Sequence, residues 1–186
     1  MPVFLLLCLF IFTSCDSDNT EQKLPKAFFD LKGFINGQII SLGQQHPMVS
    51  KTMAMGDESS NISTKEIDWK KELELFVQAD INKPAFRQSY NVSQPDSVSY
   101  LYSLKTGQDL PVKYLKVKLH KSHGLPVRID AFLVSENKLY QSEKNISLLL
   151  HVREDVASIV SYKITGFQKL ATMKKKPFLV AATLTF

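Results

Sequence analysis

The spacing of apolar residues changes near residue 98 of the chain. Before that point they recur every three to four positions, and after it they recur every two. The first spacing is typical of amphipathic helices, and the second is typical of strands with one buried face. The sequence therefore predicts an α+β fold in which two N-terminal helices pack on a twisted antiparallel β-meander sheet. A half-barrel is the more strongly curved form of the same arrangement.

The first predicted helix starts at Ala27 and ends near Gly43, a residue suited to a helix C-terminus. Its apolar face consists of Phe28, Leu31, Ile35, Ile39 and Leu42. After it, the turn residues from Gly56 to Asn61 predict a short hairpin with a polar tip.

The second predicted helix has a capping box at its start. Ser63 can accept a hydrogen bond from a backbone N–H three residues on, and Glu66 can reach back to the start of the helix. Pro84 disfavours helical geometry in the residue before it, so this helix should end near Asn82.

Six strands follow, separated by turn residues, and the short links predict antiparallel pairing of neighbours. The predicted strands are Ser97–Leu104, Val112–His120, Pro126–Val134, Lys138–Val152, Ser158–Leu170 and Phe178–Phe186. Alternation gives the strand around Lys116 and Lys118 one polar face. Other strands are apolar on both sides, and four of their residues form a candidate apolar ligand surface: Phe132, Leu148, Leu150 and Phe178.

An apolar run from Val3 to Phe12 opens the chain and ends in small residues. It is too short to span a bilayer and reads as a secretory signal peptide. The following residues, Phe12-Thr13-Ser14-Cys15, resemble the lipobox of bacterial lipoproteins. That resemblance implies a signal peptide over residues 1–14 and an acylated Cys15. An acidic tether would then cover residues 15–26, and a single domain residues 27–186.

Two alternatives for this segment are an ordinary signal peptide cut nearby and a buried N-terminal strand. Phe12 replaces the usual lipobox leucine, and the n-region has no Lys or Arg. Taken whole, the chain resembles exported lipoproteins of the Bacteroidota, a resemblance that brings no known activity. It implies a cell-envelope protein held at the membrane by its lipid, at the outer rather than the inner membrane, with the leaflet undecided.

Charge and cysteine content narrow the function classes. The net charge is +5 and the pI is near 9.1, but the basic residues are spread along the chain. Clustered basic residues with interleaved aromatics are absent, so we do not expect a nucleic-acid partner. Lys174–Lys176 reads as a solvated turn, with contact to anionic lipid or glycan as the alternative. Cys8 and Cys15 are the only cysteines, so the domain has no disulfide.

Motifs for catalysis or metal binding are not recognisable. His120 and His123 stand close together, but no third ligand is near them in sequence, so we expect no metal site and no cofactor. There is no Gly-x-Ser-x-Gly elbow and no phosphate-binding loop. We therefore expect no enzymatic activity.

Asp96-Ser97-Val98 resembles the short acceptor motif for O-glycosylation of exported Bacteroidota proteins. The resemblance implies a glycan on Ser97. A turn capped by Asp96 is the alternative.

Two functions follow as expectations. The first is a non-catalytic binding or assembly module whose sheet contacts an envelope protein, glycan or lipid. The second is a carrier of lipid or another small apolar ligand in a half-barrel cavity.

Overall fold

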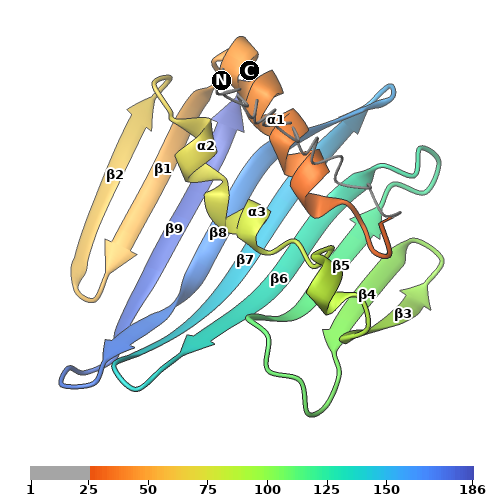
Figure 1. Cartoon of the computed structure of the whole chain (residues 1–186). Coiled ribbons are helices and arrows are strands. Elements are labelled where there is room, and N and C mark those ends of the chain that lie inside the picture. The colour runs from red at the N-terminus through yellow and green to blue at the C-terminus, as the bar shows by residue number, and fades with distance from the viewer. Residues whose placement is uncertain (1–25) are drawn as a thin grey trace, which may run out of the picture.

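The computed structural model describes residues 26–186, and its main element there is one antiparallel sheet of nine strands (Figure 1). The strand order is β2-β1-β9-β8-β7-β6-β5-β4-β3, so strands from β3 onward pair with their neighbours in sequence and the β1–β2 hairpin joins beside β9. The bounds are β1 Met48–Met55, β2 Glu58–Thr64, β3 Tyr90–Asp96, β4 Ser99–Leu104, β5 Val112–Leu119, β6 Pro126–Glu136, β7 Tyr140–Arg153, β8 Val156–Leu170 and β9 Lys176–Thr185.

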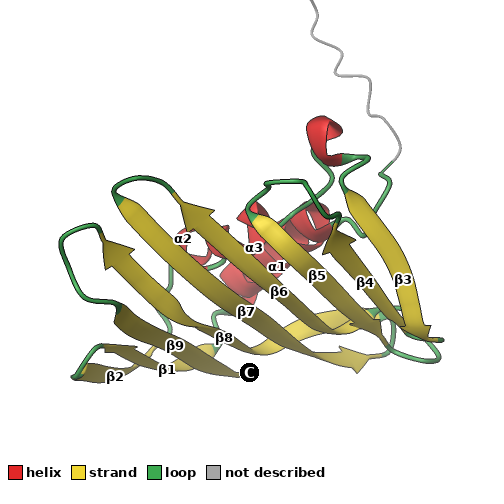
Figure 2. Cartoon of the chain, turned by 90° about the horizontal axis from the view of Figure 1, so that it is seen from below, coloured by secondary structure: helices red, strands yellow, loops and turns green. Residues whose placement is uncertain are grey.

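The predicted antiparallel meander is confirmed, and the sheet is open rather than closed into a barrel. β2 and β3 form its two edges, which lie far apart (Figure 2). The sequence pattern does not predict β3, because this strand contains Pro95 and is exposed at almost every position. An edge strand tolerates proline, since one side of its backbone has no partner strand.

Helix α1 covers Leu31–Gln45 and so begins and ends later than the pattern predicts. Asp30 caps it by accepting a 2.8 Å hydrogen bond from the backbone N–H of Gly33. The helix continues past Gly43 and ends at His46, whose φ of 45° is left-handed.

The predicted second helix is wrong at its start and in its continuity. Ser63 belongs to β2, where it pairs with Ser50 of β1. Asp68 is the actual cap and accepts from the N–H of Lys71 at 3.2 Å, because an Asx side chain competes well for the first free amides of a helix. The chain then forms two short helices broken at Leu73, α2 (Trp69–Glu72) and α3 (Glu74–Gln78), followed by the 3₁₀ turn η1 (Pro84–Phe86).

All three α-helices lie on one face of the sheet, across its upper half in Figure 1. Leu31, Ile35 and Leu42 of α1 are buried there, as is Phe76 of α3. The sheet contributes alternate residues to the same core, with Leu115, Val117, Ile129, Leu148 and Ile159 almost fully buried. Within residues 26–186, none of the helices is long and apolar enough to cross a membrane.

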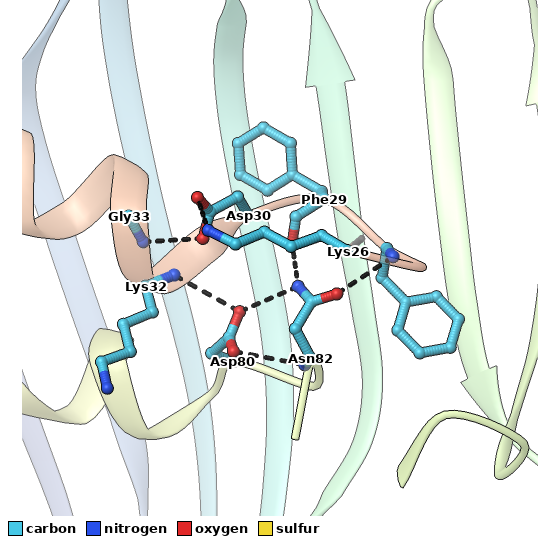
Figure 3. Close-up of polar contacts among 8 residues, drawn as sticks. Lys26, Phe29, Asp30, Lys32, Gly33, Asp80 and Asn82 are labelled. Carbon is cyan, nitrogen blue, oxygen red and sulfur yellow. Dashed lines mark hydrogen bonds and ion pairs between the residues drawn. The ribbon is translucent and has the colours of Figure 1, made fainter. Parts of the chain in front are cut away.

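A polar clamp of Asp80 and Asn82 fixes the segment that leads into α1 (Figure 3). Asn82 accepts from the N–H of Phe28 at 3.1 Å and donates to the carbonyl of Phe29 at 2.8 Å. The buried Asp80 accepts from the N–H of Lys32 at 3.3 Å and from Asn82. A carboxylate is stabilised at this position because it faces the positive end of the α1 dipole.

Buried tyrosines make the stability of the fold sensitive to alkali. Burial raises the pKa of Tyr90 to about 12, and burial with a hydrogen bond to Glu72 raises that of Tyr162. These groups contribute full stability below the unfolded pKa near 10 and lose it as the pH rises toward their folded pKa. Urea titrations between pH 8 and pH 11 should therefore show a free energy of unfolding that falls above about pH 10. A flat profile over this range would contradict the assignment, and Tyr90→Phe should flatten the slope.

Candidate functional site

The side of the sheet opposite the helices, here called the helix-free face, presents a broad polar surface. Strand register aligns its side chains in rows that cross the whole sheet. One row contains Ser63, Ser50, Thr183, Ser161, Leu149, Arg128, Lys118, Ser99 and Asp96 from β2 to β3. The next row contains Asn61, Thr52, Ala181, Lys163, Ser147, Asp130, Lys116, Leu101 and Ser93.

Small hydroxyl side chains fill the half of this face that lies toward β2. Ser50, Thr52, Ser161 and Thr183 contribute to it from β1, β8 and β9. Serine and threonine hydroxyls both donate and accept hydrogen bonds. This half of the face therefore offers neutral polar contacts with little bulk.

Toward β5 the helix-free face becomes cationic. Lys118 lies directly opposite Arg128 in the register of β5 and β6, and Lys116 lies opposite Asp130. Lys163 of β8 stands in the same row as Lys116, opposite Ser147. We call Lys116, Lys118, Arg128 and Lys163 the cationic cluster. Like charges directly opposite one another destabilise a strand pair, so the Lys118–Arg128 pair is a local cost of this arrangement.

Asp130 is the acid at the centre of these cations, opposite Lys116. It accepts from Arg128 Nε at 2.8 Å and from Arg128 Nη2 at 2.9 Å, which is the two-pronged geometry of strong arginine–carboxylate pairs. These hydrogen bonds raise the pKa of the Arg128 guanidinium. Asp96 of β3 lies opposite Ser99 at the end of the Lys118 row and interacts with Lys118. Because two carboxylates stand among four cations, the cluster still keeps a surplus of positive charge.

Two adjoining hollows occupy the helix-free face, with volumes of about 770 Å³ and 600 Å³. Arg128, Ser147 and Lys163 line both of them. The first hollow extends from these residues over the hydroxyl-rich half, and the second extends over Tyr114 and Lys116. An extended ligand could therefore contact the hydroxyls and the cationic cluster together.

The four residues of the candidate apolar surface are not brought together. Leu148 and Leu150 are buried in the core beneath the helices. Phe178 lies on that same side of the sheet, half-buried against Gly166. Phe132 lies on the helix-free face, where its ring is 6.1 Å from that of Tyr114.

Cys15 lies outside the described residues. Ser97 is exposed in the turn between β3 and β4, where the Asp96 carboxylate accepts from the N–H of Val98 at 2.9 Å. That hydrogen bond lowers the pKa of Asp96. The same turn satisfies both interpretations of the motif, since a capped turn also presents Ser97 to solvent.

The paired histidines gain one acidic neighbour in the fold. The rings of His120 and His123 are 4.8 Å apart, and His123 Nδ1 lies 3.2 Å from the Asp155 carboxylate. Asp155 lies in the turn between β7 and β8, far from His123 in the sequence, so no local sequence pattern predicts their contact. Across residues 26–186, no group of three or more ligating side chains is placed to hold a metal ion.

Sequence reasoning identifies most of the cationic side chains but not their assembly. Alternation places Lys116 and Lys118 on a polar face and puts Arg128 beside Asp130 on another. The register that sets Lys118 opposite Arg128 depends on long-range pairing. Comparison with protein-family models, with curated proteins and with solved structures gives no match.

Proposed function

We propose that this protein is a non-catalytic binding module of the cell envelope, held at the membrane by a lipid on Cys15, and that its helix-free face binds an acidic glycan. The observation that carries the proposal is the cationic cluster beside the hydroxyl-rich half of the same face. Sugar hydroxyls match serine and threonine side chains, and acidic groups match lysine and arginine.

The spread of polar contacts over the two hollows supports an extended ligand. A small anion would need only a few converging donors, whereas here hydroxyls and cations follow one another across several strands. The cluster also supports an anionic partner because four cations share this part of the face with only two carboxylates, Asp96 and Asp130.

The position of the polar clamp supports the view that the helix-free face is accessible to a partner. The clamp holds Phe28 and Phe29 on the helix side, where Phe28 packs against Tyr90 and Tyr102. The described part of the chain therefore begins on the side opposite the cationic cluster. An anchor that reached the domain from this side would leave the helix-free face accessible to a partner.

Replacing two lysines of the cluster should weaken binding. We expect Lys116→Gln/Lys118→Gln to lower the affinity for polygalacturonate about tenfold, because two surface charges that face the polymer are lost. Isothermal titration of the full chain in detergent measures this, and the wild-type affinity should fall as salt is raised because exposed charges are screened.

The matched control is Lys32→Gln/Lys70→Gln, which removes two exposed lysines from the helix side. It changes the net charge equally and should leave the affinity unchanged. Equal losses in both variants would mean that only the overall charge matters. Binding of neutral dextran as tight as that of polygalacturonate would contradict the acidic ligand class.

The anchor is tested separately by metabolic labelling with a fatty-acid analogue. Wild type should take up the label and Cys15→Ala should not, because acylation needs the Cys15 sulfur. A lipoprotein carries more than one acyl chain, which is enough for stable membrane attachment. Equal labelling of the two chains would contradict the anchor and leave the glycan-binding proposal standing.

The carrier function has no comparable support from the fold. Leu148 and Leu150 are covered by the helix layer, so an apolar ligand could reach them only after the helices moved away. Phe132 lies on the opposite face and could not contact the same ligand.

A further inference from the structure

The two edges of the sheet differ in how they are protected against pairing with another strand. β3 contains Pro95, and its register with β4 shifts between Ser93 and Asp96. Proline and irregular register are devices that block edge pairing. β2 has neither of them, because its seven residues pair with β1 in unbroken register.

Backbone groups along the outer side of β2 are free within the described part of the chain. The N–H of Gly56, just after β1, donates to the carbonyl of Pro177 in β9. Because hydrogen bonding alternates along an antiparallel pair, the even-numbered residues of β1 are the ones hydrogen-bonded to β9. The odd-numbered residues of β1 therefore bond to β2. Since bonding alternates along an antiparallel pair, Ser59, Asn61 and Ser63 direct their N–H and C=O groups away from β1.

We propose that the β2 edge is a self-association site, at which the β2 strand of a second copy of this chain pairs antiparallel about a two-fold axis at Asn61. The two sheets would then continue into one another. This proposal is independent of what the helix-free face binds.

The sequence of β2 is self-complementary in this register. Asn61 lies opposite Asn61 of the second copy, Ser59 lies opposite Ser63, and the residues with free backbone groups meet each other. Odd-numbered residues of one copy lie opposite odd-numbered residues of the other, and even-numbered opposite even-numbered. The helix-free face of one sheet therefore continues the helix-free face of the other. An isologous contact requires this kind of symmetry.

Charge and apolar surface also fit a second copy. Glu58 is the only charged residue of β2, and the pairing places Asp57 opposite Lys65 of the second copy. No like charges therefore meet across the axis. Ile62, which is 43% exposed, would lie diagonally across the axis from its own counterpart and lose contact with water.

Disulfide trapping tests the register. The background is the full chain in detergent with Cys8→Ser and Cys15→Ser, so that each introduced cysteine is the only one. Hydrogen-bonded antiparallel pairs have Cα atoms about 5.5 Å apart, within the range of a disulfide. Asn61→Cys should form a covalent dimer on mild oxidation, and a mixture of Ser59→Cys and Ser63→Cys chains should form a mixed dimer.

Asn91→Cys on the β3 edge is the matched control and should stay monomeric. Equal trapping at Asn61 and Asn91 would mean random collision and would overturn the proposal. So would trapping at Asn61 without the mixed Ser59–Ser63 dimer, because the register would then be different.

A proline at the axis gives a second test without cysteines. Asn61→Pro removes an N–H that faces away from β1, so the monomer should keep its melting temperature. The dimer loses two symmetric hydrogen bonds, so its dissociation constant should rise about tenfold or more. Sedimentation should show about twice the 21.1 kDa chain mass for wild type and the single mass for the variant. A wild-type chain that stays monomeric, or a variant that dimerises as well, would overturn the proposal.

Discussion

Replacing Glu72 by alanine is expected to cost about 3–5 kcal/mol of unfolding free energy. Glu72 of α2 accepts from Lys51 Nζ at 2.7 Å and 2.8 Å and from the Tyr162 hydroxyl at 2.6 Å. The Lys51 and Glu72 side chains are only 13% and 16% exposed. Without the carboxylate, a nearly buried ammonium and a buried hydroxyl lose their partner together.

Urea denaturation of Glu72→Ala measures the cost, with Glu74→Ala as the matched control. Glu74 begins the next helix and is exposed, so its loss should change stability far less. The double variant Lys51→Met/Glu72→Leu should recover more than half of the loss, because a pair of apolar side chains replaces a buried ion pair well. If Glu72→Ala were as stable as Glu74→Ala, the contact would not fasten α2 to the sheet.

Gly166→Ala is expected to destabilise the domain by about 2–3 kcal/mol, because the added methyl group overlaps backbone. A Cβ at Gly166 would lie 1.9 Å from the carbonyl oxygen of Glu143 and 3.1 Å from the Phe178 ring. The oxygen belongs to β7, the partner strand of β8, so it can move only if the two strands separate. Thermal denaturation should show a clearly lower melting temperature.

Gly37→Ala is the control for Gly166→Ala. Gly37 lies in α1 with open space where a Cβ would be, so alanine there should stabilise the helix by about 1 kcal/mol. The two identical substitutions should thus have opposite signs. A Gly166→Ala protein as stable as wild type would contradict the close approach of β7 to β8.

Period-two alternation predicts the strands from Val112 onward well, since each has one face in the core and turn residues at both ends. The second helix is predicted poorly because Ser63 suits both a helix cap and a strand, and pairing with β1 decides between them. The placement of β1–β2 beside β9 rests on contacts distant in sequence, which no local pattern contains.

The candidate site, too, is predictable only in part from the local sequence pattern, because the rest depends on strand pairing distant in sequence. Local alternation identifies Lys116 and Lys118 as solvent-facing, and that part is visible in the sequence. The surplus of charge arises only when register brings Arg128 and Lys163 onto the same face. Phe132 and Leu148 show the converse, since similar local patterns place them on opposite faces of the sheet.

Methyl NMR of the full chain during titration with polygalacturonate tests the central claim most directly. Leu101, Leu149 and Ala181 line the hollows of the helix-free face, while Ile40 is exposed on α1. The account predicts that the signals of the first three shift with the ligand and that the Ile40 signal stays in place. Shifts at Ile40 with none at Leu101, Leu149 and Ala181, or no shifts at all, would contradict it.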